Sequence, residues 1–223
     1  MSAADRLPAS FLAPLFESVV ARAIEPVEDA VAELAEGEAE LIARAVASRR
    51  REFSTGRRLA RRLLAERGVV AGPILRDDDR VPIWPARFTG SISHSRDYAV
   101  VALCAAEDCF GVGVDVEPDE PVQPGIERIV CTEAERRWLD AADTEETARG
   151  RRVKLFFSAK EAVYKAFYPR VRVFWGFHDV TLELDEPSGR FDAILPASAG
   201  RARAEGRFVR GHGTIVSGVL APC

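Results

Sequence analysis

At 223 residues, with 47% hydrophobic and 30% charged residues, the chain can bury a full core as one large domain or two compact halves, which excludes a disordered protein. The 31 Lys and Arg residues nearly balance the 35 Asp and Glu residues, so the net charge of −4 gives no general argument for a nucleic-acid partner. No apolar run approaches the ~20 residues of a membrane span, and Asp5, Pro8 and Pro14 interrupt the stretch where a signal peptide would be apolar. We therefore expect a cytoplasmic protein without a membrane segment.

The cysteines predict no disulfide framework. They form no C-x-x-C pair, and two of them lie in or beside apolar runs, where a free thiol behaves as a small core residue. Reduced, structural thiols are therefore expected at Cys104, Cys109, Cys131 and Cys223.

The first part of the chain predicts an acidic loop followed by a basic helical region. Apolar spacing indicates helices over residues 38–46 and from Leu59 to a C-terminal Gly68, and arginines crowd residues 48–58 between them. This cluster fits a solvated helix face, a phosphate-binding pocket or a nucleic-acid surface. The residues alone favour the solvated face and place nucleic acid last, because Phe53 is the only aromatic residue inside the cluster.

Two polar segments follow, each with a structural and a functional interpretation. Residues 76–80 read as a surface loop, whose arginines could reach a ligand or pair with its three aspartates. Next, Ser91–Ser95 places His94 among hydroxyl groups just before a buried strand over residues 98–103. A lone histidine is usually structural, yet this placement is also typical of an anion-binding loop.

Residues 111–118 alternate strictly between valine and other residues. A strand here directs its three valines to a core and places Gly111, Gly113, Asp115 and Glu117 on the opposite face. A solvent-facing strand tolerates such acids, but the glycines also let another group approach the backbone. Because the two carboxylates repel each other, a bound cation such as Mg²⁺ is the alternative interpretation.

Residues 156–169 predict a helix that gathers charge on one side. Ser158 is expected as the N-cap, Glu161 as its capping-box partner, and Pro169 as the stop signal. Lys160, Glu161 and Lys165 lie opposite an apolar stripe, and Glu161 could pair with Lys165 at i,i+4.

The remaining segments predict scaffold and an α+β fold. Thr132 is expected to cap a helix, residues 140–151 to form a polar loop, and residues 180–184 and 207–220 to form strands around a turn at residues 187–189.

The strand and the helix together resemble the paired signature of the 4′-phosphopantetheinyl transferases, G-x-D-x-E and [WF]-[SC]-x-K-E-x-x-x-K. Here the first half is Gly113–Glu117, and the second, about forty residues later, is Phe157–Lys165. Ser91–Ser95 resembles a third family block, and Arg49 and Arg57 stand where members carry basic residues. The resemblance covers roughly residues 45–180 and is closest to the enterobactin-type branch. One departure is that this chain has Arg80 near the place where many relatives have a Gly-Lys-Pro loop.

This resemblance implies transfer of the 4′-phosphopantetheine arm of coenzyme A to a serine of an apo acyl or peptidyl carrier protein, releasing 3′,5′-ADP. The implied cofactor is Mg²⁺, or Mn²⁺ in its place, with Asp115, Glu117 and Glu161 as ligands. Glu161, directly or through a metal-bound water, is the implied base, and Lys165 neutralises phosphate charge. The implied coenzyme A contacts are Arg49, Arg57, Arg76, Ser93, His94, Lys160 and Lys165. Phe174 and Trp175 could line the pantetheine arm or pack in the core.

The family also implies the organisation of the chain. The length is similar to that of the monomeric class that serves siderophore, polyketide and nonribosomal peptide synthesis, whose two similar α/β halves are related by pseudo-twofold symmetry. The halves would be residues 1–105 and 106–223, with the active site at their junction. Two alternatives from other classes are an Mg²⁺-dependent phosphohydrolase and a nucleic-acid-binding module built on Arg49 to Arg67.

Overall fold

The α+β fold expected from the sequence is confirmed by a computed structural model, which describes residues 6–142 and 145–223. Two antiparallel sheets follow each other along the chain, one of three strands ordered β1-β3-β2 and one of five ordered β4-β8-β7-β6-β5. The strands are β1 (Ala21–Pro26), β2 (Phe88–His94), β3 (Tyr98–Ala105), β4 (Gly111–Pro118), β5 (Thr181–Asp185), β6 (Arg190–Ile194), β7 (Arg203–Gly211) and β8 (Thr214–Ala221). The α-helices are α1 (Ala47–Glu66), α2 (Ile126–Val130), α3 (Glu133–Ala141) and α4 (Glu146–Val171), and short 3-10 turns are η1 (Ala9–Leu15), η2 (Val31–Glu33), η3 (Glu40–Ile42), η4 (Phe177–Asp179) and η5 (Ala197–Ala199).

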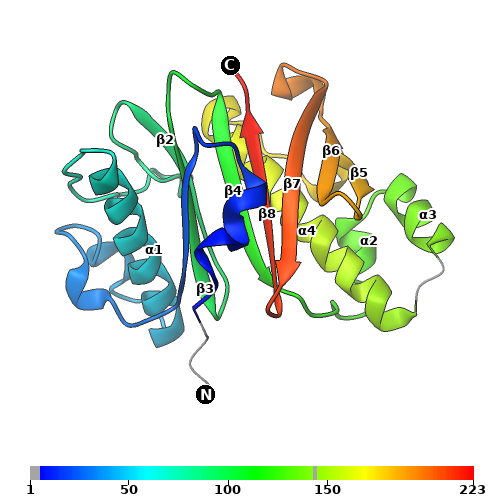
Figure 1. The fold of residues 1–223 in the computed structure, drawn as a ribbon, viewed down its shortest axis with the longest axis horizontal. Helices are drawn as coiled ribbons and strands as arrows, with labels where there is room; N and C mark the ends of the chain where they lie inside the picture. The colour runs from blue at the N-terminus through cyan, green and yellow to red at the C-terminus, as the bar shows by residue number, and fades with distance from the viewer. Residues whose placement is uncertain (1–5, 143–144) are drawn as a thin grey trace.

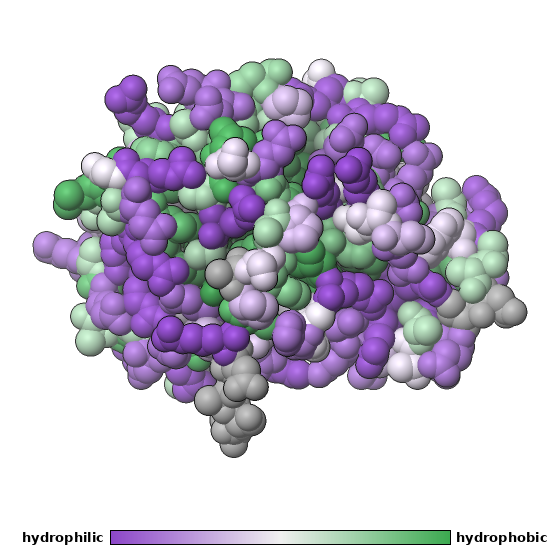
Figure 2. All heavy atoms as spheres, in the orientation of Figure 1, coloured by the Kyte–Doolittle hydropathy of each residue, from purple (hydrophilic) through white to green (hydrophobic). Residues whose placement is uncertain are grey.

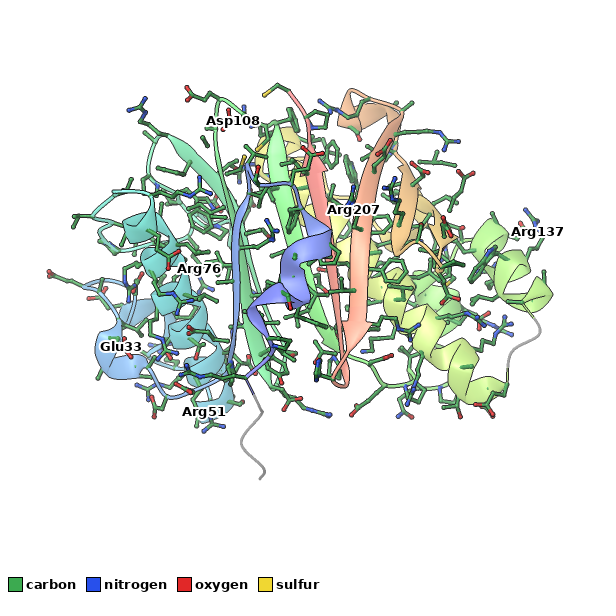
Figure 3. All side chains as sticks on the ribbon, in the orientation of Figure 1. Glu33, Arg51, Arg76, Asp108, Arg137 and Arg207 are labelled. Atoms are coloured by element: carbon green, nitrogen blue, oxygen red, sulfur yellow. The ribbon has the colours of Figure 1, made fainter. Side chains whose placement is uncertain are left out.

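Each sheet is covered by one long helix, α1 on the three-stranded sheet and α4 on the five-stranded sheet (Figure 1). The turn η1 crosses the face of the second sheet opposite α4, where Arg207 of β7 lies beside it (Figure 3) and donates to the Pro14 carbonyl at 3.2 Å. Hydrophilic residues dominate the face seen in Figure 2, with apolar residues in small patches between them. Among the described residues, no helix is long and apolar enough to cross a membrane.

The two sheets meet where β2 runs beside β4. The Ser91 hydroxyl accepts a hydrogen bond from the Val114 amide at 3.1 Å and donates to the Val114 carbonyl at 3.4 Å, so one side chain joins the two strands. The predicted boundary near residue 105 falls between β3 and β4. Any group bound at this junction is reached by residues from both halves of the chain.

Strand β4 shows the predicted alternation. Val112, Val114 and Val116 are at most 1% exposed and pack into the core between the halves. The group that approaches the opposite face is α4 itself, because a Cβ built on Gly113 would lie 1.9 Å from the Ala162 carbonyl oxygen. The missing side chains therefore let the helix backbone rest directly on the strand.

The predicted N-cap and C-terminal stop of the helix over residues 156–169 are wrong. Helix α4 begins at Glu146, so Ser158 is an interior residue, fully buried, whose hydroxyl donates to Ser217 Oγ at 3.0 Å. Pro169 lies in the last helical turn, where the missing amide removes a single hydrogen bond, and Arg172 ends the helix in a left-handed conformation. The predicted loop over 140–151 is likewise mostly helix, with residues 143–144 outside the described part.

The basic cluster also lies in a helix rather than between two. Helix α1 spans Ala47–Glu66 without interruption, and the segment 38–46 contributes only η3. By contrast, the end of this helix near Gly68 is as predicted, with Gly68 at φ +76°. The Thr132 cap is confirmed too, since its hydroxyl and the Glu135 carboxylate form a complete capping box.

The close approach of α4 to β4 leaves no room for a side chain at Gly113. Gly113→Ala should lower the free energy of unfolding by about 3 kcal/mol, because the added methyl group meets helix backbone that cannot move aside. Urea unfolding followed by circular dichroism measures this change. Gly72→Ala is the matched control, since nothing lies within 4 Å of its added methyl group, and it should change stability by less than about 0.5 kcal/mol. Equal effects of the two substitutions would contradict the argument.

Candidate active site

Helix α4 and strand β4 bring acidic and basic side chains together beside the junction. The Lys165 ammonium lies 2.5 Å from Asp115 Oδ1 and 3.8 Å from Glu161 Oε2. The predicted i,i+4 pair of Glu161 and Lys165 is therefore present, but Asp115 is the nearer partner. Glu117, two residues further along β4, is paired with Lys154 at 3.1 Å.

The Ser93 hydroxyl completes this cluster from the other half. It donates to Asp115 Oδ1 at 2.8 Å and accepts from Lys165 Nζ at 3.0 Å, so β2, β4 and α4 are joined at one point. Ser93 and Asp115 are both buried. The serine thus holds the carboxylate and the lysine in a fixed relation.

The carboxylates of this cluster oppose one another's charge. Burial raises the pKa of Glu161, and the charges of Asp115 and Glu117 raise it further, against the opposing effect of Lys165. Burial and the Asp115 charge likewise raise the pKa of Glu117. Lys165 carries the balancing charge, since the surrounding carboxylates raise its pKa although burial acts to lower it.

These three carboxylates are the residues that could hold a cation. Asp115 Oδ2 is buried and has no hydrogen-bond partner, which leaves one oxygen available to a ligand. Across residues 6–142 and 145–223, no three His, Cys, Asp or Glu side chains form a group that could hold a metal as they stand, and Lys165 and Lys154 pair with two of the carboxylates. A set of hard oxygen donors of this kind suits Mg²⁺ once the lysines turn to another anion.

A cavity of about 260 Å³ opens next to this cluster, between the two halves. One wall comes from the N-terminal half and carries arginines and His94, and the other comes from α4. The lining includes Arg49, Phe53, Arg57, Arg76, Arg80, His94, Glu161, Tyr164, Lys165 and Tyr168.

Arg57 is the most buried of the arginines in the cavity wall, at 5% exposure. Its Nε donates to the Ile74 carbonyl at 2.7 Å, and its guanidinium lies 4.4 Å from the Phe53 ring centroid. Burial lowers its pKa to about 10, so it remains charged at neutral pH. A charged guanidinium held in this way offers its remaining N–H groups to an anion in the cavity.

His94 and Arg49 lie together at the same wall. An Arg49 guanidinium nitrogen contacts His94 Nε2, and His94 Nδ1 lies 3.2 Å from Glu52 Oε2. This arrangement suits a neutral ring that donates from Nδ1 and accepts at Nε2. Burial, followed by the charges of Arg49 and Lys165, lowers the pKa of His94 to about 4.

The loop over residues 76–80 closes the cavity from the N-terminal half. Arg76 lines the cavity and lies beside α1 (Figure 3), with a long contact of 3.5 Å to the Leu41 carbonyl. Two of the three aspartates of the loop pair with Arg172 at the end of α4, Asp77 at 2.7 Å and Asp79 at 3.1 Å. These two aspartates thus have their partner in the other half, and Arg76 and Arg80 of the loop line the cavity.

Lys160 does not lie where the sequence placed it. The residue is 3% exposed, and its ammonium donates to Glu135 Oε2 at 2.7 Å, to the Val130 carbonyl at 2.8 Å and to the Phe177 carbonyl at 2.7 Å. All three protons are therefore committed within the C-terminal half. The structure gives Lys160 a structural role in place of the expected contact with coenzyme A.

Sequence reasoning missed the two tyrosines and the arginine at the end of α4. Tyr164 and Tyr168 stack with ring centroids 4.8 Å apart and line the cavity, and Arg172 lies over Tyr168. Their i,i+4 spacing, on the face that carries Glu161 and Lys165, was the available signal.

Phe174 and Trp175 border a second, smaller groove of about 120 Å³ on the other side of Glu161. Trp175 is buried and donates from Nε1 to Ser198 Oγ at 2.9 Å, whereas Phe174 is 77% exposed. Trp175 is a core residue that also lines the groove, and Phe174 lies at its edge, where its ring meets that of Tyr164 edge to face with centroids 6.1 Å apart.

The basic helix α1 is not a uniformly solvated face. Arg58 pairs with Glu25 at 3.1 Å, and Arg61 pairs with the buried Glu38, so part of its charge is neutralised by the acidic segment before it. Arg49 and Arg57 instead line the cavity.

A pocket with arginines on one wall and a carboxylate–lysine cluster on the other, between two α/β halves, is the arrangement of a class of proteins suited to binding a phosphate ester at such a junction. Comparison with protein families agrees with this class. The 4′-phosphopantetheinyl transferase N-terminal domain matches residues 37–104, and the 4′-phosphopantetheinyl transferase superfamily matches residues 111–204. The chain belongs to the 4′-phosphopantetheinyl transferase superfamily.

Curated relatives span most of the chain. The 4′-phosphopantetheinyl transferase Svp of Streptomyces mobaraensis is 35% identical over 86% of this chain and 80% of its own length. PptT of Mycobacterium tuberculosis, of the same description, is 38% identical over 69% of this chain and 68% of its own. Enterobactin synthase component D of Salmonella typhi is 35% identical over 55% of this chain and 50% of its own.

The assignment of Lys160 to the core has a measurable consequence. Lys160→Met should lower the free energy of unfolding by about 3–5 kcal/mol, because it leaves the buried Glu135 carboxylate without its charge partner. Glu135→Gln in the same background should restore part of this loss. Denaturant unfolding of the three variants checks both statements, and a fully stable Lys160→Met protein would contradict them.

His94 should titrate far below an ordinary histidine. Because its pKa is lowered in the folded state, the unfolded chain binds more protons between pH 6.5 and about 4, so stability falls as the pH drops through this window. NMR titration of the ring should give a midpoint near pH 4. In His94→Gln the part of the pH dependence of unfolding that arises in this window should disappear. A midpoint near 6.5 would contradict the burial argument.

Proposed function

We propose that the protein transfers the 4′-phosphopantetheine arm of coenzyme A to a serine hydroxyl of an apo acyl or peptidyl carrier protein and releases 3′,5′-ADP. The observation that supports this most is a single cavity that carries Arg57 and His94 on one wall and Glu161 and Lys165 on the other. Coenzyme A carries a 3′-phosphate and a diphosphate, which require cationic groups at two separate places.

The arginine wall is proposed to bind the phosphates of the nucleotide. Arg49, Arg57 and Arg76 supply planar donors that match phosphate oxygens, and His94 can accept a proton as an anion approaches. Lys165 lies at the opposite wall, where its charge would answer the diphosphate once the anion competes with Asp115.

The acidic cluster is proposed to hold Mg²⁺, or Mn²⁺ in its place, through Asp115, Glu117 and Glu161. When bound, the ion would supply stabilisation of negative charge on the diphosphate and its leaving group. Ser93 fixes Asp115 for this purpose, and its bond to Lys165 keeps that ammonium within reach of the same phosphate.

Glu161 is proposed to act as the base for the attacking hydroxyl. Burial raises the pKa of its carboxyl group, and an oxygen that the ion does not occupy would accept the proton. The groove beside it, which Phe174 and Trp175 border, is proposed to hold the pantetheine arm. The reacting bond would then lie at Glu161, between the nucleotide and the arm.

We further propose that the protein acts in the cytoplasm as a monomer, since one chain supplies both walls of the cavity. Its carrier proteins would belong to siderophore, polyketide or nonribosomal peptide synthesis. The first of these is the setting named by one relative, enterobactin synthase component D.

The proposed reaction is tested by the mass of its product. We expect the protein, incubated with coenzyme A, Mg²⁺ and an apo carrier domain, to increase the carrier's mass by one phosphopantetheine group. Asp115→Asn and Glu161→Gln should each slow this transfer by about 10²-fold or more. The control is Glu205→Gln, an exposed glutamate on β7, which should transfer at the rate of the unchanged protein.

Other outcomes identify other functions. No mass increase on several different carriers, with the protein shown to be folded, would refute the proposal. Release of inorganic phosphate from coenzyme A without a carrier would indicate a phosphohydrolase. Binding of nucleic acid with a steep salt dependence, unaffected by Glu161→Gln, would indicate a nucleic-acid-binding module.

A further inference from the structure

A fully buried glutamate lies behind the arginine wall of the cavity. Glu38 has 0% exposure and stands in the acidic segment that precedes η3. Its Oε1 accepts the Ile74 amide at 2.8 Å, and its Oε2 accepts the Ala35 amide at 2.9 Å and contacts Arg61. This carboxylate has no contact with the cavity itself.

The residue that Glu38 holds is also the residue that holds Arg57. The Ile74 amide donates to Glu38, while the Ile74 carbonyl accepts from Arg57 Nε at 2.7 Å. Ile74 is 1% exposed and packs in the core between α1 and the first sheet. The segment at Ile74 is therefore fixed from both sides, and the position of its carbonyl fixes the guanidinium of Arg57.

The surroundings of Arg57 make such support necessary. Arg76, Arg49 and Arg61 all lie close enough to lower its pKa, and burial lowers it most. Glu38 acts in the opposite direction and raises it. Without a buried negative charge, three like charges and desolvation would favour a different side-chain position for Arg57, away from the other arginines.

We propose that Glu38 is a positioning residue for recognition of the 3′-phosphate of coenzyme A: it fixes Ile74 and, through the Ile74 carbonyl, directs Arg57 into the cavity. The inference rests on the proposed function, which places the phosphates of the nucleotide at the arginine wall, and it assigns the 3′-phosphate to Arg57. It adds that discrimination between coenzyme A and 3′-dephospho-coenzyme A depends on a residue that touches neither.

The test compares these two substrates in Glu38→Gln. The amide sets an N–H group against one of the main-chain amides and removes the charge beside Arg57, so KM for coenzyme A should rise about tenfold with kcat little changed. KM for 3′-dephospho-coenzyme A should not change, because this substrate lacks the 3′-phosphate that Arg57 is proposed to bind. Equal increases for both substrates, or no increase for either, would overturn the proposal.

Two matched variants separate positioning from stability. Arg61→Gln removes the charged partner of Glu38 and leaves its bond to the Ile74 amide, so it should destabilise the fold yet retain the preference for coenzyme A. In an Arg57→Gln background, Glu38→Gln should have no further effect on the preference. A loss of preference in Arg61→Gln, or additive losses in the double variant, would show that Glu38 acts only on the fold.

Separate controls distinguish a variant that fails to fold from a failure of the proposed function. Should Glu38→Gln fail to fold, Glu38→Asp keeps the charge but is one methylene too short to reach Ile74, and should show the same selective rise in KM. If the unchanged protein transfers nothing, the proposed function fails, and calorimetry with 3′,5′-ADP and 5′-AMP replaces the kinetics. The unchanged protein should bind 3′,5′-ADP more tightly than 5′-AMP, and Glu38→Gln should lose most of that preference. Equal binding of the two nucleotides by the unchanged protein, or a preference that Glu38→Gln leaves unaltered, would overturn the inference.

Discussion

The close contact between α4 and β4 is the constraint on which the site depends. Because Gly111 and Gly113 carry no side chains, the carbonyls of the helix come against the strand, and the next residue on the same face, Asp115, meets the helix at Lys165. The strand alternation and the helix repeat then fix which side chains face each other. A larger residue at either glycine would push α4 away from β4 and so separate Lys165 from Asp115, although neither of these two residues would itself be changed.

Those features that depend on short-range pattern could be predicted from the sequence. The alternation of β4 and the cap at Thr132 follow from spacing. That Glu161 would lie near Asp115 and Glu117 was implied only by the family resemblance, because about forty residues separate the two motifs. The start of α4 could not be predicted, because serine is a residue type that commonly caps helices. Inside the helix, the Ser158 hydroxyl instead donates a hydrogen bond to Ser217, which lies far along the chain. A local pattern cannot show a partner that arrives only through the fold.

The same limit explains the basic residues. Lys160 and Lys165 lie on one polar face by sequence, yet Lys160 is drawn into the core by Glu135 and main-chain carbonyls, while Lys165 reaches the site. On α1, neighbouring positions differ by about 100°, so Arg57 is turned inward and Arg58 outward to Glu25. The solvated-face interpretation therefore fails for both residues, since Arg58 is paired and Arg57 lines the cavity, and the phosphate pocket stays a prediction for Arg57.

The two halves solve the problem of orienting a charge in similar ways. Each has one fully enclosed glutamate, Glu38 or Glu135, that accepts main-chain amides and pairs with a basic side chain of the long helix that follows it. A buried ion pair adds little net stability compared with apolar side chains of similar volume, although breaking it is costly. Stability alone therefore explains such pairs poorly. What both glutamates fix is a main-chain amide, that of Ile74 in one half and that of Leu182 in the other, and in the N-terminal half the Ile74 carbonyl in turn holds the guanidinium of Arg57.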